Sequence, residues 1–118
     1  MSSLEHIRAI TDYNHALFER LWDSIMELTD EQFVQEIDYS HGSVRNQITH
    51  AATTQEGWLR GLKGDPNARQ FSFDPADYPT RESARELWNE TAKRFDEYIA
   101  ALDEADLQHT PTGMLGPV

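Results

Sequence analysis

The chain has 118 residues, no cysteine and a formal net charge of −11 at pH 7, a length that suits one domain. The dispersed acidic residues predict a solvated surface that repels nucleic-acid backbones and anionic lipids, and no apolar run approaches the ~20 residues of a membrane span. Lack of cysteine excludes disulfides and thiolate ligands, and with a polar start that does not resemble a secretion signal it favours a cytoplasmic protein.

The first predicted element is a long amphipathic helix from about Leu4 to Leu28, with Ser2 as its expected N-cap. Apolar residues recur every three or four positions along one face, which we expect to be the buried face. Asn14 interrupts this face in its middle. The face comprises Ile7, Ile10, Asn14, Leu17, Leu21, Ile25 and Leu28, and is widened by Phe18 and Trp22.

A short helix is predicted next. Thr29 and Gln32 have the spacing of a capping box, which places a helix start at this point. The helix is expected to end near Glu36. The following residues, up to Gly42, are expected to form a connector, because their alternating pattern is too short to indicate a sheet.

The second long helix is expected from Val44 to about Lys63, with Ser43 as its cap. Gly57 and Gly61 lie four residues apart inside it, although each glycine costs about 1 kcal/mol relative to alanine in a helix. This spacing indicates close approach of another helix or room for a ligand, and His50 lies on the same small-residue face. The predicted apolar line is Val44, Ile48, Ala51, Ala52, Trp58, Leu59 and Leu62.

A loop over residues 64–79 leads to the third long helix, which is expected to be capped by Thr80 and to end near Asp103. Three long helices with one apolar face each need a fourth to close a core. Gly116-Pro117 resembles the start of a helix, so we expect a bundle that is incomplete at its C-terminal end or completed by a partner chain. The expected inner face of the third helix is Ala84, Leu87, Thr91, Phe95, Tyr98 and Leu102, flanked by Trp88 and Ile99.

Histidine is the only residue type in the chain whose side-chain nitrogens commonly bind metal ions. No two histidines have the three- or four-residue spacing of a helical metal site. A surface or core position is the more frequent explanation for a single histidine. His50 stands out for its mid-helix position, followed by His41, which precedes the same helix. The five histidines are His6, His15, His41, His50 and His109.

A candidate ligand pocket is formed by Asn14, Thr54, Gly57 and Trp58. Trp58 is most simply a core residue, and a pocket wall is the alternative. Glu56 is expected to be solvated, as helical glutamates on so acidic a chain usually are. No nucleophile elbow, phosphate loop or dinucleotide fingerprint is present.

The stretch His41-Gly-Ser-Val-Arg-Asn-Gln-Ile-Thr-His50-Ala, followed by Glu56-Gly-Trp-Leu-Arg-Gly-Leu, resembles the DinB-like (YfiT-like) superfamily. Tyr13-Asn14 and the segment Ala-Leu-Asp-Glu-Ala-Asp-Leu at the end of the third helix support the resemblance, which spans nearly the whole chain. It implies an all-α, up-down-down-up four-helix bundle, often a homodimer. This chain would contribute three long helices and one short helix, with the last helix missing or truncated.

The resemblance also implies a divalent metal, zinc or nickel, held by three histidines, one of which is matched by His50. The other two lie on the fourth helix as His-x-x-x-His, and this sequence has no such helix. Three neutral imidazoles leave positions at which water or a thiolate binds and is deprotonated near neutral pH. The implied activity is thiol-dependent S-transfer or hydrolysis of a small-molecule thiol or electrophile. The alternative is a non-catalytic helical module, without metal, that dimerises or binds a small molecule.

Overall fold

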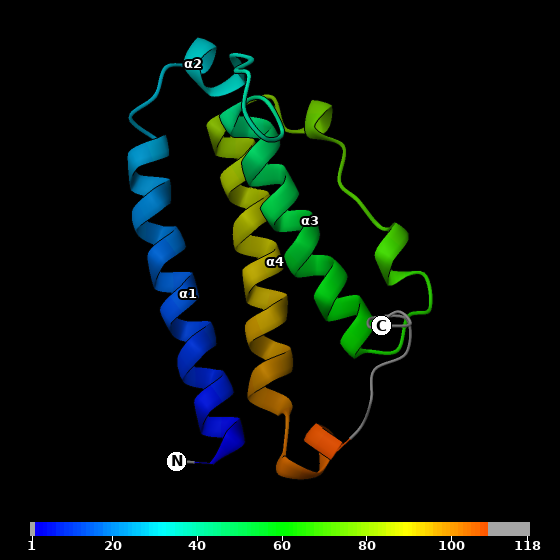
Figure 1. Cartoon of the computed structure of the whole chain (residues 1–118). Helices are drawn as coiled ribbons and strands as arrows, with labels where there is room; N and C mark the ends of the chain where they lie inside the picture. The colour runs from blue at the N-terminus through cyan, green and yellow to red at the C-terminus, as the bar shows by residue number, and fades with distance from the viewer. Residues whose placement is uncertain (1, 109–118) are drawn as a thin grey trace.

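A computed structural model describes residues 2–108 of the chain (Figure 1). This part is helical and contains no strand, which confirms the predicted all-α class. No helix in it is long and apolar enough to cross a membrane. The predicted helix start at Gly116-Pro117 lies outside the described residues. The four helices are α1 (Ser3–Ile25), α2 (Asp30–Val34), α3 (Val44–Leu62) and α4 (Arg81–Ala101), with short 3-10 helices at Ala68–Gln70, Pro75–Asp77 and Glu104–Gln108.

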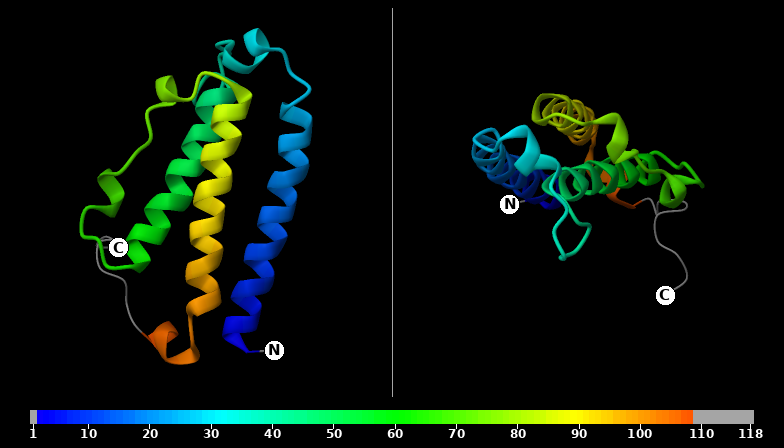
Figure 2. Two further views of the ribbon diagram at one scale, coloured as in Figure 1. Left: turned by 180° about the vertical axis from the view of Figure 1, so that it is seen from behind. Right: turned by 90° about the horizontal axis from the view of Figure 1, so that it is seen from above.

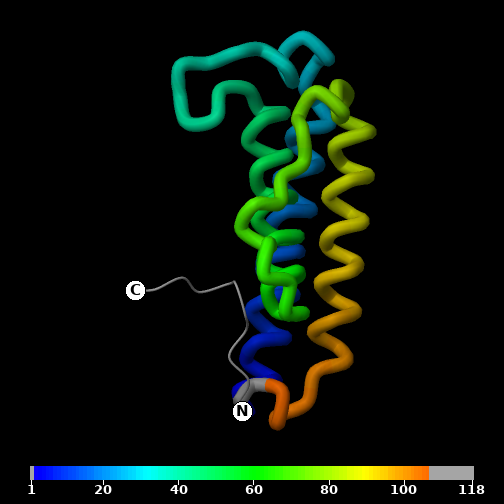
Figure 3. Tube along the Cα trace, turned by 90° about the vertical axis from the view of Figure 1, so that its right-hand side faces the viewer, coloured from blue at the N-terminus to red at the C-terminus, as the bar shows by residue number. Residues whose placement is uncertain are grey.

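The long helices run up, down and down. Figure 1 shows α1 rising from the N-terminus, whereas α3 and α4 both descend from the end that carries α2. Because α3 and α4 are parallel, the loop between them has to return along the whole length of α3, which it does on the outer side of the bundle (Figure 3). α4 packs against both α3 and α1, while α1 and α3 hardly approach each other. The three helices therefore form an open arc with α4 in the middle (Figure 2).

Polar caps start the helices where the sequence predicts them. The Thr29 hydroxyl accepts from the Gln32 backbone N–H at 3.1 Å, and the Gln32 side chain accepts from the Thr29 N–H at 2.9 Å. Ser43 caps α3 in the same way, and Thr80 forms a capping box at the start of α4. These bonds satisfy N–H groups that have no partner inside the helix, so each helix start is fixed locally.

α3 ends in a Schellman turn. Gly64 has φ +90°, which places it in the left-handed region that favours glycine. The Asp65 N–H donates to the Arg60 carbonyl and the Gly64 N–H donates to the Gly61 carbonyl, both at 3.0 Å. The return loop therefore starts in a defined direction directly after the helix.

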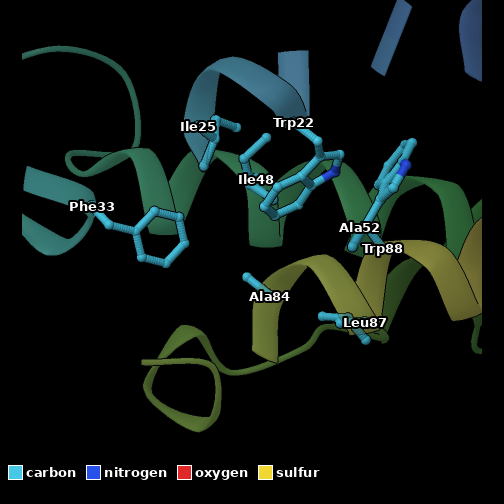
Figure 4. Close-up of a cluster of buried hydrophobic side chains, with 8 residues drawn as sticks. All are labelled: Trp22, Ile25, Phe33, Ile48, Ala52, Ala84, Leu87 and Trp88. Atoms are coloured by element: carbon cyan, nitrogen blue, oxygen red, sulfur yellow. The ribbon is translucent and has the colours of Figure 1, made fainter. Parts of the chain in front are cut away.

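The hydrophobic core lies toward the α2 end of the bundle, where all four helices meet. Phe33 of α2 is fully buried there and closes this end. Phe18 of α1 packs against this core and stacks on Trp88 of α4, with ring centroids 4.1 Å apart and an interplanar angle of 19°, which extends the packing of α1 on α4. The cluster comprises Trp22, Ile25, Phe33, Ile48, Ala52, Ala84, Leu87 and Trp88 (Figure 4).

The predicted inner face of α1 is wrong in part. Ile10, Leu17 and Leu21 are 49%, 43% and 45% exposed, and Asn14 is exposed as well. The face that packs on α4 instead carries Leu4, Thr11, Phe18 and Trp22. The helix has two neighbouring apolar stripes, and the stripe with the large aromatic rings buries more surface. The second stripe faces outward along the open side of the arc.

Candidate functional site

A groove of about 570 Å³ lies between α1 and α3 on the open side of the arc. It exists because these two helices make few contacts with each other along their length, and side chains of α4 lie at its base. Its lining is mainly apolar and aromatic, with few polar groups, which is the usual character of a ligand site. The aromatic rings are those of Phe18, Trp58, Trp88 and Phe95, and the main polar groups at the base are His15 and Gln55.

The predicted pocket residues are divided between two hollows. Asn14, Thr54 and Trp58 line the groove, and Trp58 is 50% exposed rather than part of the core. Gly57 instead lines a smaller hollow of about 300 Å³ between α3 and the return loop, which Thr54 and Trp58 share. A Cβ at Gly57 would lie 3.5 Å from the Ala68 carbonyl oxygen, an ordinary van der Waals distance, so the packing of the loop on α3 does not by itself require glycine at this position.

His50 is exposed on α3 and lines the smaller hollow. Its ring stacks on that of His41, with centroids 4.0 Å apart and an interplanar angle of 28°. His41 belongs to the loop between α2 and α3, which projects from the bundle in Figure 3. Within residues 2–108, no hydrogen bond or ion pair involves the nitrogens of His50.

The described residues do not complete a metal site. No group of three histidine, aspartate or glutamate side chains in residues 2–108 is arranged to hold a metal ion. His41 does not supply a second ligand in its present position, because the lone pair of an imidazole lies in the ring plane and two stacked rings cannot aim at one ion. His109 lies outside the described residues.

His15 of α1 lies at the junction of the three long helices. Its Nε2 is 2.8 Å from Oε1 of Gln55 on α3, and its Nδ1 is 3.0 Å from Oδ1 of Asp96 on α4. The rings of Trp88 and Phe95 meet its ring edge-on, with centroids 6.2 and 6.3 Å away. The signal for this position was its alignment with the buried stripe of α1 at helical spacing.

Glu56 is buried, contrary to the expectation that it is solvated. Its side chain is 7% exposed and is paired with Arg94 of α4. Both carboxylate oxygens accept hydrogen bonds from the guanidinium group, at 2.9 Å for Oε1 and 3.2 Å for Oε2. Because both oxygens are engaged, Glu56 links α3 to α4 and is not a free base in the groove.

Comparison with known protein families gives one clear result. The profile of the DinB superfamily matches residues 4–117, which is nearly the whole chain. Comparisons with curated proteins and with solved structures give no match. The up-down-down order of the long helices and the parallel arrangement of α3 and α4 agree with the bundle that the resemblance implied. The chain belongs to the DinB superfamily.

Proposed function

We propose that this protein is a metal-dependent enzyme domain of the DinB superfamily, with His50 as one ligand of a zinc or nickel ion. The proposed reaction is S-transfer to a small-molecule thiol, or hydrolysis of an electrophile. The observation that carries the proposal is the environment of the His50 imidazole. It is exposed in the middle of α3, and no hydrogen bond or ion pair in residues 2–108 involves its nitrogens.

The position of His50 relative to the groove supports a catalytic use. Thr54 and Trp58 follow it at intervals of four residues, so the three residues form a row along α3. Thr54 and Trp58 line both the groove and the hollow that contains His50. A substrate with an apolar part in the groove would therefore reach toward the metal ligand along this row.

The other ligands are proposed to come from outside residues 2–108 or from a second copy of the chain. Zinc in catalytic sites commonly has three protein ligands and one open position, so a single imidazole does not hold it. A homodimer and a cytoplasmic location are parts of the same proposal. His50 is exposed on α3, and Thr54 and Trp58 connect its hollow to the groove, so an additional element that covers the groove would lie beside it.

Metal content measured by plasma mass spectrometry tests the proposal. The protein translated to its natural stop codon is purified after growth with zinc or nickel, and compared with its His50→Ala variant. We expect about one ion per chain in the first and a loss of most of that metal in the second. His6→Ala on the surface of α1 is the matched control and should keep the metal. Stoichiometric metal in a folded His50→Ala variant would refute the proposal.

A second candidate function is a metal-free helical module that binds a small molecule or another copy of itself. Ile10, Leu17, Leu21 and Trp58 are all exposed along the open side of the arc. An apolar helix face that is left exposed often marks an interaction site. This function predicts no metal in any form of the chain and a stable dimer by light scattering, which distinguishes it from the enzyme.

A further inference from the structure

The charges of the chain are unevenly distributed, although its net charge is −11. Residues 41–73, which comprise α3 and the first part of the return loop beside it (Figure 1), contain four basic and two acidic residues. The rest of the chain contains six basic and nineteen acidic residues. α3 and its loop therefore form a positively charged part of a strongly acidic protein.

The positive charges of this segment are not neutralised by neighbouring carboxylates. Glu56, one of its two acidic residues, is buried and paired with Arg94 of α4. Within residues 2–108, Arg45, Arg60 and Lys63 form no ion pair, whereas every basic residue of α4 forms one. The outer surface of α3 therefore keeps cationic groups that are able to attract an anion from solution.

The hollow of about 300 Å³ that contains His50 lies in this positively charged part. Arg69 of the return loop lines it, and Phe71 forms a wall whose ring centroid is 3.8 Å from the guanidinium carbon of Arg60. No carboxylate lines this hollow, whereas three other hollows, which lie beside α4, are each lined by two or more carboxylates. The hollow at His50 therefore favours an anion, and the hollows beside α4 do not.

The polar side chains that line the hollow offer hydrogen-bond donors. Thr53 Oγ1 accepts from the Phe73 N–H at 3.0 Å, and no acceptor for its own hydroxyl hydrogen is found among the described residues. Within the same part of the chain, the Thr54 hydroxyl and the Trp58 indole N–H have no hydrogen-bond partner. Arg69 already interacts within the chain, but its guanidinium group has five N–H donors, so a contact of this kind leaves others for a ligand. Such a set of donors suits a negatively charged oxygen.

We propose that this hollow binds a small carboxylate that carries a flat apolar group. The carboxylate faces Arg69 and the hydroxyl groups of Thr53 and Thr54, and the flat group lies against the rings of Trp58 and Phe71. A single guanidinium group matches a carboxylate in charge and in planar geometry. At physiological salt, charges more than about 8 Å apart are largely screened, so the groups that line the hollow decide which ions it attracts rather than the net charge of the chain.

Titration with benzoate followed by NMR tests the site. The 15N-labelled protein is first freed of metal, so that benzoate cannot bind to an ion at His50. We expect benzoate to shift the indole N–H of Trp58 and the backbone amide of Arg69, while the indole N–H of the buried Trp22 stays in place. Benzamide has the same ring without the charge, and inorganic phosphate has charge without a ring, so each should bind about tenfold more weakly. Benzamide or phosphate that binds as tightly as benzoate would overturn the proposal.

Three variants locate the benzoate site. Arg69→Gln should weaken benzoate binding about tenfold, because charge-assisted hydrogen bonds are lost. Arg20→Gln removes the same charge from the exposed surface of α1 and should leave the affinity unchanged. Thr54→Val removes one donor at similar size and should cause a smaller loss. Absence of shifts with benzoate, or equal affinities of the wild type and Arg69→Gln, would refute the site. Because these titrations use metal-free protein, their outcome is independent of the metal content that tests the proposed function.

Discussion

The guanidinium group of Arg94 on α4 donates two hydrogen bonds to the carboxylate of Glu56 on α3, with Nε 2.9 Å from Oε1 and Nη2 3.2 Å from Oε2. The glutamate is buried, whereas the arginine side chain is 41% exposed. A buried carboxylate is tolerated when both of its oxygens are paired, and it is costly when the partner is removed. The pair therefore joins two parallel helices and fixes their register.

Replacement of Arg94 with methionine is expected to destabilise the protein. The change leaves a buried carboxylate without a partner, and partial exposure of the site reduces the cost to about 1–3 kcal/mol. Urea denaturation followed by circular dichroism measures it. Lys93→Met is the matched control on the same helix, because the pair that Lys93 forms with Glu97, at 4.0 Å, is exposed. It should change the free energy of unfolding by about 0.5 kcal/mol or less. Equal effects of the two variants would contradict the role of the pair.

Two adjacent residues test which face of α1 is buried. Trp22 is fully buried against α4, whereas Leu21 is exposed on the open side of the arc. Trp22→Ala should cost about 3–5 kcal/mol of unfolding free energy, as is typical of a large cavity in a core. Leu21→Ala in the same 118-residue chain should cost well under half of that. A larger loss for Leu21→Ala would mean that the sequence-predicted face of α1 is the buried one.

Tyr78 gives a prediction at alkaline pH. Burial, and then the charges of Asp77 and Glu90, raise the pKa of Tyr78 above its ordinary value of 10.0. Its ring lies edge-on to Phe73, with centroids 6.1 Å apart. Because the folded-state pKa is the higher one, the fold favours the protonated phenol. This contribution to stability is complete below the unfolded-state pKa and is lost as the pH rises through the folded-state pKa.

Ultraviolet titration of the folded chain should therefore show one tyrosine that ionises above the normal range, and Tyr78→Phe should remove it. Stability of the wild type should fall at alkaline pH more than that of Tyr78→Phe. Tyr13→Phe, on the exposed face of α1, should leave the late-titrating tyrosine in place. A late tyrosine that persists in Tyr78→Phe would contradict this assignment.

Arg8 is expected to anchor the C-terminal end of α4 to α1. Its guanidinium group donates to the carbonyl oxygens of Ala100 at 3.2 Å and Leu102 at 3.1 Å. These carbonyls lie at the helix end and have no partner inside the helix. Arg8→Met should cost about 1 kcal/mol, and hydrogen exchange in the last turn of α4 should accelerate. Arg20→Met on the same helix is the control, and an identical exchange pattern in both variants would argue against the anchor.

Local chemistry determined how well each part of the fold could be predicted. The starts of α2, α3 and α4 were correct because Thr29, Ser43 and Thr80 bond to their own helix and need no tertiary context. The inner face of α1 was wrong because two apolar stripes compete, and only packing on α4 decides between them. The simplest interpretation of Trp58, as a core residue, was wrong for a similar reason, since its periodicity fits but its side chain is 50% exposed; a pocket wall was the alternative.

The polar residues were harder to place than the apolar ones. Glu56 looks like any helical glutamate until Arg94, from a distant part of the sequence, is brought opposite to it. His15 gains its role only because Gln55 and Asp96 come from two other helices. The proposal that His50 binds a metal came from the family resemblance of the residues around it, since its spacing to the other histidines does not match a metal-binding pattern.

Crystallography with anomalous scattering at the zinc and nickel absorption edges is the most direct test of the proposed function. The crystals should contain the protein translated to its natural stop codon and loaded with the metal. The account predicts an anomalous peak about 2.0–2.1 Å from a ring nitrogen of His50, with further histidine ligands from outside residues 2–108 or from a second copy. A metal peak that does not involve His50, or no peak after incubation with either metal, would contradict it.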